Sequence, residues 1–137
     1  MNVHRQAAGV VVQAPAKVNL FFEILAKRED GYHEIETLMV PIGLYDTLTA
    51  TNEPDGQVRV ACRWAQRGAE STLGQLPPEE ENLATRAVLL LRRRLGVAVG
   101  LSIDLVKRIP SAAGLGGGSS DAAAALLAAN ALWNLGL

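Results

Sequence analysis

The sequence predicts an α+β domain, and three features of its amino-acid pattern support this class. The first half alternates apolar and polar residues, which indicates strands. Two later segments, residues 81–96 and 119–135, have the composition of helices, and an alternating segment lies between them. The length of 137 residues fits one domain, residues 1–137, and a hydrophobic content of 49% suffices for a core.

The predicted strands begin with the β-branched segment "GVVVQA" at residues 9–14, which we expect Pro15 to end. A second strand is predicted over residues 17–28, with one face buried. The Asp-Gly pair in "EDGYH" is a turn signal, so the chain is expected to return through a third strand at residues 33–44. The expected buried face of the second strand consists of Val18, Leu20, Phe22 and Ile24.

The middle of the chain is predicted to change from strands to a helix. Residues 46–52 and 57–64 are further strands, and the polar, Gly- and Pro-rich residues 66–79 form a loop. The segment "ENLATRAVLLLRRRLG" predicts a helix that Gly96 ends. Arginines 92–94 lie in its last turn, which favours a solvated helix end over a ligand site. The expected buried face of this helix consists of Leu83, Ala87, Leu90 and Leu91.

The last part of the chain is predicted to be a strand, a glycine-rich loop and a helix. Residues 99–108 alternate again, and the final helix is expected to begin at about Ser119. Lys107 and Arg108 either contribute to the binding of phosphate groups or only end the strand.

Composition and charge exclude several classes of function. A formal net charge of −1 gives no general affinity for nucleic acid or for an acidic membrane. The single cysteine, Cys62, excludes an internal disulfide framework and fits a reducing compartment. We find no apolar signal segment at the N-terminus, and the longest apolar run is interrupted by Asn130 and Asn134. We therefore expect a cytoplasmic protein that binds neither membrane nor nucleic acid.

The glycine-rich loop predicts a phosphate site. The first N–H groups of a helix have no partner within it, and together with the helix dipole they attract anions. Glycine leaves these groups open and allows positive φ angles. Ser119 and Ser120 add hydroxyl groups, either as N-caps or as phosphate donors. The alternative is a flexible turn that happens to precede a helix. The four glycines of this loop are Gly114, Gly116, Gly117 and Gly118.

Two common phosphate-binding fingerprints do not fit this loop. A Walker A loop requires a lysine before its final serine or threonine, and none precedes Ser119. A dinucleotide-binding loop requires a third glycine at the sixth position, which is Ser119 when counted from Gly114.

The motif "PSAAGLGGGSSDAA" resembles the glycine-rich signature of the GHMP kinases (galactokinase, homoserine, mevalonate and phosphomevalonate kinases). Two further segments resemble that family independently. The segment "APAKVNLFFEILAKREDGYHEIETLMVPIGLYDTL" resembles an opening motif with Ala-Lys-x-Asn-Leu and Asp-Gly-Tyr-His, and "ENLATRA" resembles an Asn-Leu segment near the adenine pocket. All three motifs are most similar to those of the members that act on a cytidine diphosphate-linked methylerythritol.

The resemblance implies the GHMP kinase N-terminal fold, which is similar to domain 2 of ribosomal protein S5. It also implies ATP-dependent phosphorylation of the 2-hydroxyl of 4-diphosphocytidyl-2-C-methyl-D-erythritol in non-mevalonate isoprenoid biosynthesis, with ATP and Mg²⁺. Lys17 would be the catalytic residue beside the acceptor, Asn19 and the stacking Tyr32 would bind substrate, and His33 would hydrogen-bond the cytosine. The implied ATP-binding residues are Asn82, Pro110, Ser111, Ala112, Ala113, Gly114, Leu115, Gly116, Gly117, Gly118, Ser119 and Ser120. No metal-binding side chain is implied.

The chain departs from the family in one respect. Members carry a Gly-Ala-Asp-Val-Pro segment after the glycine-loop helix, and this sequence stops before it, so the catalytic base is assigned neither to Asp104 nor to Asp121. We therefore expect a truncated N-terminal domain with little kinase activity of its own. Two alternatives remain open at this point: a non-catalytic nucleotide- or phosphate-binding module, and an interaction protein whose glycine loop is only a turn.

Two further expectations concern substitution and assembly. Gly117→Val is expected to abolish ATP binding and to leave the fold intact. The helix at residues 119–135 is apolar nearly all round, so we expect a homodimer or a domain-exchanged assembly that covers it. The alternative is that the sheet covers this helix within one chain.

Overall fold

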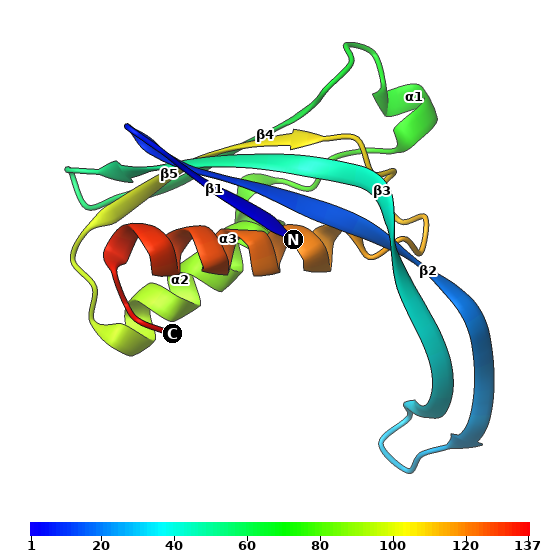
Figure 1. The fold of residues 1–137 in the computed structure, drawn as a ribbon. Coiled ribbons are helices and arrows are strands. Elements are labelled where there is room, and N and C mark those ends of the chain that lie inside the picture. Colours follow the sequence, from blue (N-terminus) through cyan, green and yellow to red (C-terminus); the bar gives the residue numbers. More distant parts are fainter.

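A single mixed sheet with its two longer helices on one face forms the body of the protein, as the computed structural model of residues 1–137 shows (Figure 1). The α+β class predicted from the sequence is therefore confirmed. The strands are β1 (Asn2–Gln6), β2 (Gly9–Lys27), β3 (His33–Glu53), β4 (Val58–Trp64) and β5 (Gly100–Lys107). The helices are α1 (Glu70–Leu73), α2 (Leu83–Leu95) and α3 (Gly117–Trp133), with the short 3₁₀ helix η1 at Glu79–Glu81.

The strand order is β1-β2-β3-β5-β4, so the last strand in sequence lies between two earlier ones. β5 pairs antiparallel with β3 and parallel with β4. Because a parallel pair needs a long crossover, the chain between β4 and β5 contains α1, η1 and α2. The sequence pattern missed β1, α1 and η1, since each is too short to show a period.

Strands β2 and β3 are much longer than predicted. β2 continues through Pro15, which pairs with Tyr45, and a register shift between Pro15 and Lys17 marks a bulge. A bulge tolerates the proline because it already interrupts the ladder of hydrogen bonds. The expected break at Pro15 is therefore wrong. The predicted strands at residues 33–44 and 46–52 are likewise parts of one strand, β3.

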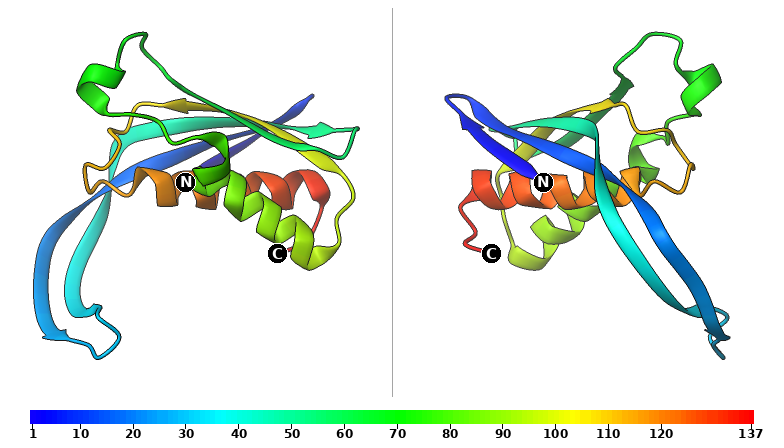
Figure 2. Two further views of the ribbon diagram at one scale, coloured as in Figure 1. Left: turned by 180° about the vertical axis from the view of Figure 1, so that it is seen from behind. Right: turned by 45° about the vertical axis from the view of Figure 1, so that its right-hand side comes forward.

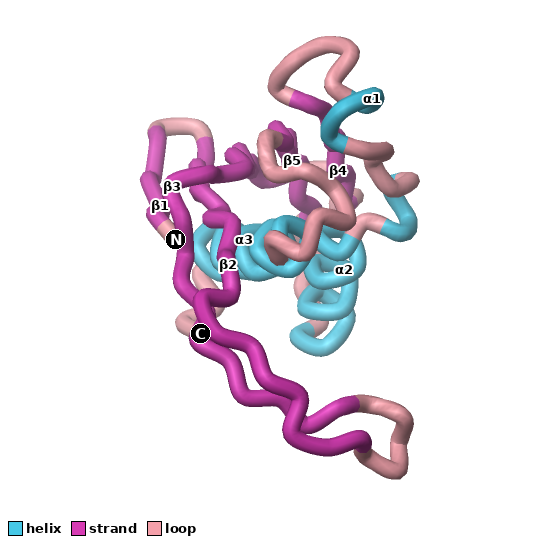
Figure 3. Tube along the Cα trace, turned by 90° about the vertical axis from the view of Figure 1, so that its right-hand side faces the viewer, coloured by secondary structure: helices cyan, strands magenta, loops and turns pink.

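The far halves of β2 and β3 form a hairpin that projects beyond the sheet and helices (Figures 1, 2 and 3). The Asp-Gly turn is confirmed, and β2 pairs with β3 as far as Lys27 and His33. The predicted buried face is wrong, because Leu20 is 66% exposed and Phe22 is 52% exposed. No element of the chain lies over this part of the hairpin, so its alternating pattern has no core to face (Figure 2).

Helix α2 ends at Gly96 as the sequence predicted, and the structure adds an N-cap at Asn82 that was not predicted. The Asn82 side chain accepts the N–H of Ala84 at 2.9 Å, and Gly96 ends the helix in the left-handed conformation with φ of 65°. The Arg92 guanidinium donates to the carbonyl of Val97 at 3.1 Å, so it serves the helix end. The predicted face was offset: Leu83 and Leu90 are exposed, whereas Leu91 is half-buried. The buried residues of α2 are Ala84, Thr85 and Val88, whose smaller side chains allow close packing.

The core lies between the sheet and helix α3. Leu48 and Ile103 from the inner face of the sheet meet a row of alanines on α3, and α2 closes the side (Figure 1). Alanine lets the helix backbone approach the sheet closely. The sheet therefore covers one face of α3 within the chain, and Leu126 and Leu127 remain exposed on the other. The alanines are Ala124, Ala125, Ala128 and Ala129. None of the helices is both long and apolar enough to cross a lipid bilayer.

Candidate nucleotide-binding site

The glycine-rich loop joins β5 to α3, and no side chain caps the start of this helix. α3 begins at Gly117, its N-cap is Gly116 in the left-handed conformation with φ of 71°, and no side chain accepts from its first turn. The helix thus begins two residues before the expected start at about Ser119, and of the two roles considered for Ser119 and Ser120 the N-cap is wrong. Because the first amides of a helix have no intrahelical partner, those of Gly117 and Gly118 are free to bind an anion.

The glycines of the loop serve two different purposes. Gly114 has φ of 73°, and a Cβ there would meet nothing within 4 Å, so the backbone borders open space. Gly117 is helical and buried, and a Cβ there would lie 2.9 Å from Ile109 Cγ2. The prediction that Gly117→Val would leave the fold intact is therefore wrong, since valine has no room there. Gly118 is exposed, and a Cβ would meet only Leu83 Cδ1 at 3.4 Å.

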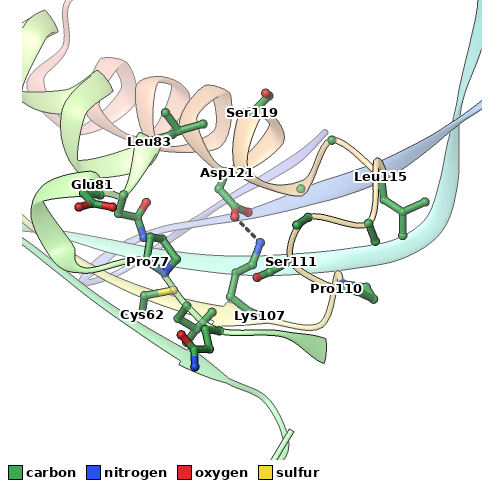
Figure 4. A pocket seen from close by; sticks show the side chains of 18 of the residues that line it. Cys62, Pro77, Glu81, Leu83, Lys107, Pro110, Ser111, Leu115, Ser119 and Asp121 are labelled. Atoms are coloured by element: carbon green, nitrogen blue, oxygen red, sulfur yellow. Dashed lines mark hydrogen bonds and ion pairs between the residues drawn. The ribbon is translucent and has the colours of Figure 1, made fainter. Parts of the chain in front are cut away.

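A pocket of about 590 Å³ opens beside this loop (Figure 4). All of the predicted ATP-binding residues except Ser120 line it, including Asn82 from the N-cap of α2. Pro77, Pro78 and Cys62 also line this pocket. The structure thus brings the "ENLATRA" segment and the glycine loop to one site, although more than twenty residues separate them in sequence.

A second pocket of about 470 Å³ lies on the other side of the loop, and Lys17, Gly116, Ser119 and Ser120 line it. The Lys17 amide donates to the carbonyl of Leu115 at 2.9 Å, which fixes β2 against the loop. The Lys17 ammonium donates to Asn19 Oδ1 at 3.2 Å. Lys17, Asn19 and Ser120 therefore gather beside the glycine loop, at a pocket that Asn82 does not line.

Tyr32 and His33 are not brought to either pocket. Both lie where β3 begins at the far end of the hairpin, and Tyr32 is 74% exposed (Figure 1). The structure therefore separates these two predicted substrate-binding residues from Lys17 and Asn19.

Sequence reasoning missed a buried group of charges beneath the loop. Lys107 forms ion pairs with Asp46 from β3 and with Asp121 from α3, the latter at 2.5 Å (Figure 4). Asp46 and Asp121 are 0% and 2% exposed. The signal for this group was present in the pattern, because Lys107 continues the buried alternation of Ile103 and Leu105. A charged residue at a buried position of a strand needs a partner.

Burial and mutual charge shift the pKa values of this group. Burial raises the pKa of Asp121 to about 7, and the Asp46 carboxylate adds to this rise while Lys107 opposes it. Burial alone would lower the pKa of Lys107, but Asp121 and Asp46 outweigh it and the pKa is raised. Burial also raises the pKa of the Cys62 thiol, to about 11.

The side chains offer no cluster of three acidic, histidine or cysteine residues that would hold a metal ion by themselves. An Mg²⁺ ion that arrives with nucleotide phosphates needs only one or two protein carboxylates, since it keeps water and phosphate ligands.

Comparison with known proteins relates the chain to one kinase family. Residues 82–137 match the family model described as the GHMP kinases N terminal domain. The 4-diphosphocytidyl-2-C-methyl-D-erythritol kinase of Shouchella clausii is 44% identical over 126 residues, which are 92% of this chain and 39% of that protein. The enzyme of the same name from Synechococcus sp. is 48% identical over 130 residues, which are 94% of this chain and 39% of that protein.

Solved structures agree with the sequence matches. A crystal structure of 4-(cytidine 5'-diphospho)-2C-methyl-D-erythritol kinase superimposes with a TM-score of 0.69 at 43% identity, covering 90% of this chain and 40% of that chain. Homoserine kinase from Cytophaga hutchinsonii superimposes with a TM-score of 0.67 over 100% of this chain and 39% of that chain; at 20% identity it supports the fold alone. The chain spans about 40% of the length of the relatives that it matches. The resemblance predicted from the motifs is confirmed.

Proposed function

We propose that this GHMP kinase N-terminal domain binds the phosphates of ATP on its glycine loop, as part of a small-molecule kinase. One observation supports this proposal above all: the uncapped start of α3 opens into a pocket that Asn82 also lines. Open backbone amides at a helix N-terminus favour phosphate groups, and the amide side chain of Asn82 suits the edge of a base or a ribose.

The proposed reaction is phosphorylation of the 2-hydroxyl of 4-diphosphocytidyl-2-C-methyl-D-erythritol. The relatives' names and the three shared motifs support this substrate. Phosphoryl transfer depends mainly on positioning and on neutralising charge. Lys17 suits the second role, because its side chain lies against Gly116 of the loop and lines the pocket there. Asn19, which accepts from Lys17, would orient it. Mg²⁺ would accompany the ATP phosphates and neutralise part of their charge.

The cytosine of the substrate is proposed to contact Tyr32 and His33. An aromatic ring suits stacking on a flat base, and an imidazole suits its edge. Since both residues lie at the hairpin tip, a substrate that also reaches Lys17 requires the hairpin to bend toward the loop.

We further propose that the chain works in the cytoplasm and associates through exposed apolar surface. The unpaired Cys62 is typical of a reducing compartment. The hairpin and the outer face of α3 both expose large apolar side chains, which favours a homodimer or a domain-exchanged assembly.

Calorimetric titration of the protein with MgATP and, separately, with CDP tests the proposed function. We expect both to bind, and we expect Gly118→Val to weaken ATP binding by ~10-fold or more, because a valine there covers the open amides. Gly43→Ala, at an exposed strand glycine with nothing within 4 Å, is the matched control and should bind like wild type.

The titrations also distinguish the alternatives. Binding of only one ligand supports a non-catalytic nucleotide- or phosphate-binding module. Binding of neither would mean that the loop is only a turn and would overturn the proposal. Unchanged ATP affinity in Gly118→Val would contradict the phosphate site.

A further inference from the structure

Every hydrogen bond that the Asp46 carboxylate accepts comes from the segment that leads into the glycine loop. Its Oδ1 accepts the backbone N–H groups of Arg108 at 2.5 Å and Ile109 at 2.9 Å, and its Oδ2 accepts from the Lys107 ammonium. These three residues end β5 and begin the loop. A single buried carboxylate on β3 therefore fixes the entry of the loop.

Lys107 extends this constraint to the exit of the loop. Its ammonium also donates to Asp121 Oδ2 at 2.5 Å, and Asp121 lies just beyond the first turn of α3. Figure 4 shows these two side chains pointing toward each other at the pocket beside the loop. The loop between residues 110 and 116 is thus tied at both ends to Asp46, directly at one and through Lys107 at the other.

Packing transmits the same constraint to the first helical residue. A Cβ on Gly117 would lie 2.9 Å from Ile109 Cγ2 and 3.3 Å from Lys107 Nζ. The backbone of Gly117 therefore rests on Ile109 and Lys107, which Asp46 holds by hydrogen bonds. A small displacement of either residue would move the amides at the start of α3.

We propose that Asp46 is a positioning residue of the phosphate site: it holds Ile109 and Lys107 where they orient the first amides of α3. Asp46 lines neither of the two pockets at the loop, so it acts only through other residues. This inference rests on the proposed function, since it takes those amides to be the phosphate-binding groups. If the buried ion pair had a purely structural role, its loss would lower stability but would not weaken the binding of phosphate groups in particular.

The test compares two carboxylates, Asp46 and Asp104. Asp46→Asn keeps the size of the side chain but removes its charge. Asp104→Asn, on the outer face of the sheet in a half-exposed pair with Arg63, is the matched control. Because bonds to a charged group stabilise more than neutral ones, we expect Asp46→Asn to weaken MgATP binding by ~10- to 100-fold and Asp104→Asn to leave it unchanged.

The affinity for adenosine distinguishes a positioning role of Asp46 from a purely structural one. It shares the base and ribose of ATP but has no phosphate, so Asp46→Asn should leave adenosine affinity, corrected for the folded fraction, at the wild-type value. Equal weakening of ATP and adenosine would overturn the positioning role. Wild-type ATP affinity in Asp46→Asn would also overturn it, while leaving the proposed function intact. Failure of the wild-type protein to bind ATP would instead reject the proposed function, and the inference with it.

Hydrogen exchange in the wild-type protein supplies a second test that does not require the variant to fold. We expect the amides of Arg108 and Ile109 to be protected without ligand, and added MgATP to slow exchange at Gly117 and Gly118. Exchange at Arg108 and Ile109 as fast as at exposed loop amides would overturn the inference.

Discussion

The two ends of the β2–β3 pair share one sequence pattern and have opposite environments. At the body end, Val12 and Leu48 point into the core and are fully buried. At the hairpin end, Leu20 and Phe22 continue the same alternation and are exposed. The difference is helix α3, which packs against the body end alone (Figure 3). Alternation therefore predicts a strand, while burial requires a second layer that the alternation does not specify.

The distribution of charged residues is also unlike what a simple core-and-surface rule predicts. The body end buries Asp46, Lys107 and Asp121 in one network, whereas the hairpin exposes its apolar side chains. Buried charge is costly unless it is paired, and here both carboxylates pair with Lys107. In this molecule the network lies directly beneath the proposed phosphate site.

The largest expected effect comes from truncating the same residue type at the two ends. Leu48→Ala should lower the free energy of unfolding by about 2–5 kcal/mol, because it leaves a cavity in the core. Leu20→Ala in the hairpin should change it by less than about 0.5 kcal/mol. Urea denaturation of both variants measures the difference. Equal losses would mean that the hairpin is covered in solution, and the contrast would fail.

Much of the fold followed from the sequence, and what did not follow depends on distant contacts. The Asp-Gly turn, the Gly96 helix end and β5 are local signals, and all were predicted. The continuation of β2 through Pro15 depends on a bulge opposite β3, which no local pattern shows. The buried face of α2 was offset because its contacts with α3 set its rotation.

The candidate site was predictable to a similar extent. Gly114 and Asn82 were recognised from motifs, and the structure brings them to one pocket. Asp46 was missed because its partners are about sixty residues away in sequence. The sequence predicts an open glycine at Gly117, because it does not reveal that Ile109 lies against it.

A change in pH is expected to have a smaller effect on the free energy of unfolding, and this effect comes only from the body end. The raised pKa of Asp121, about 7 against an ordinary value of 3.8, means that the folded state keeps a proton that the unfolded state releases. The stability contributed by this proton is full below about pH 4 and is lost as pH rises through about 7. The charged or titratable groups facing Asp121 are Asp46 on β3, Lys107 on β5 and Cys62 on β4.

Urea denaturation between pH 5 and 8 measures this contribution. Wild type should lose stability over this range relative to Asp121→Asn, which has no proton to release. Glu23→Gln removes an exposed hairpin carboxylate and should keep the wild-type slope. Identical slopes for wild type and Asp121→Asn would show that the carboxyl titrates in the ordinary range.

The smallest effect on folding and the clearest effect on assembly are expected from the hairpin. Replacing Leu20, Phe22 and Ile24 together by serine removes apolar surface that is already exposed, so the free energy of unfolding of one chain should change little. The average mass measured by light scattering at micromolar concentration should fall toward that of a monomer, because exposed apolar patches favour association.

Serine at Leu126 and Leu127 tests the outer face of α3 in the same way and should lower the mass less, since these side chains are less exposed than those of the hairpin. A wild-type protein that stays monomeric on concentration would contradict both expectations. A larger fall with the α3 variant would locate the contact on the helix and not on the hairpin.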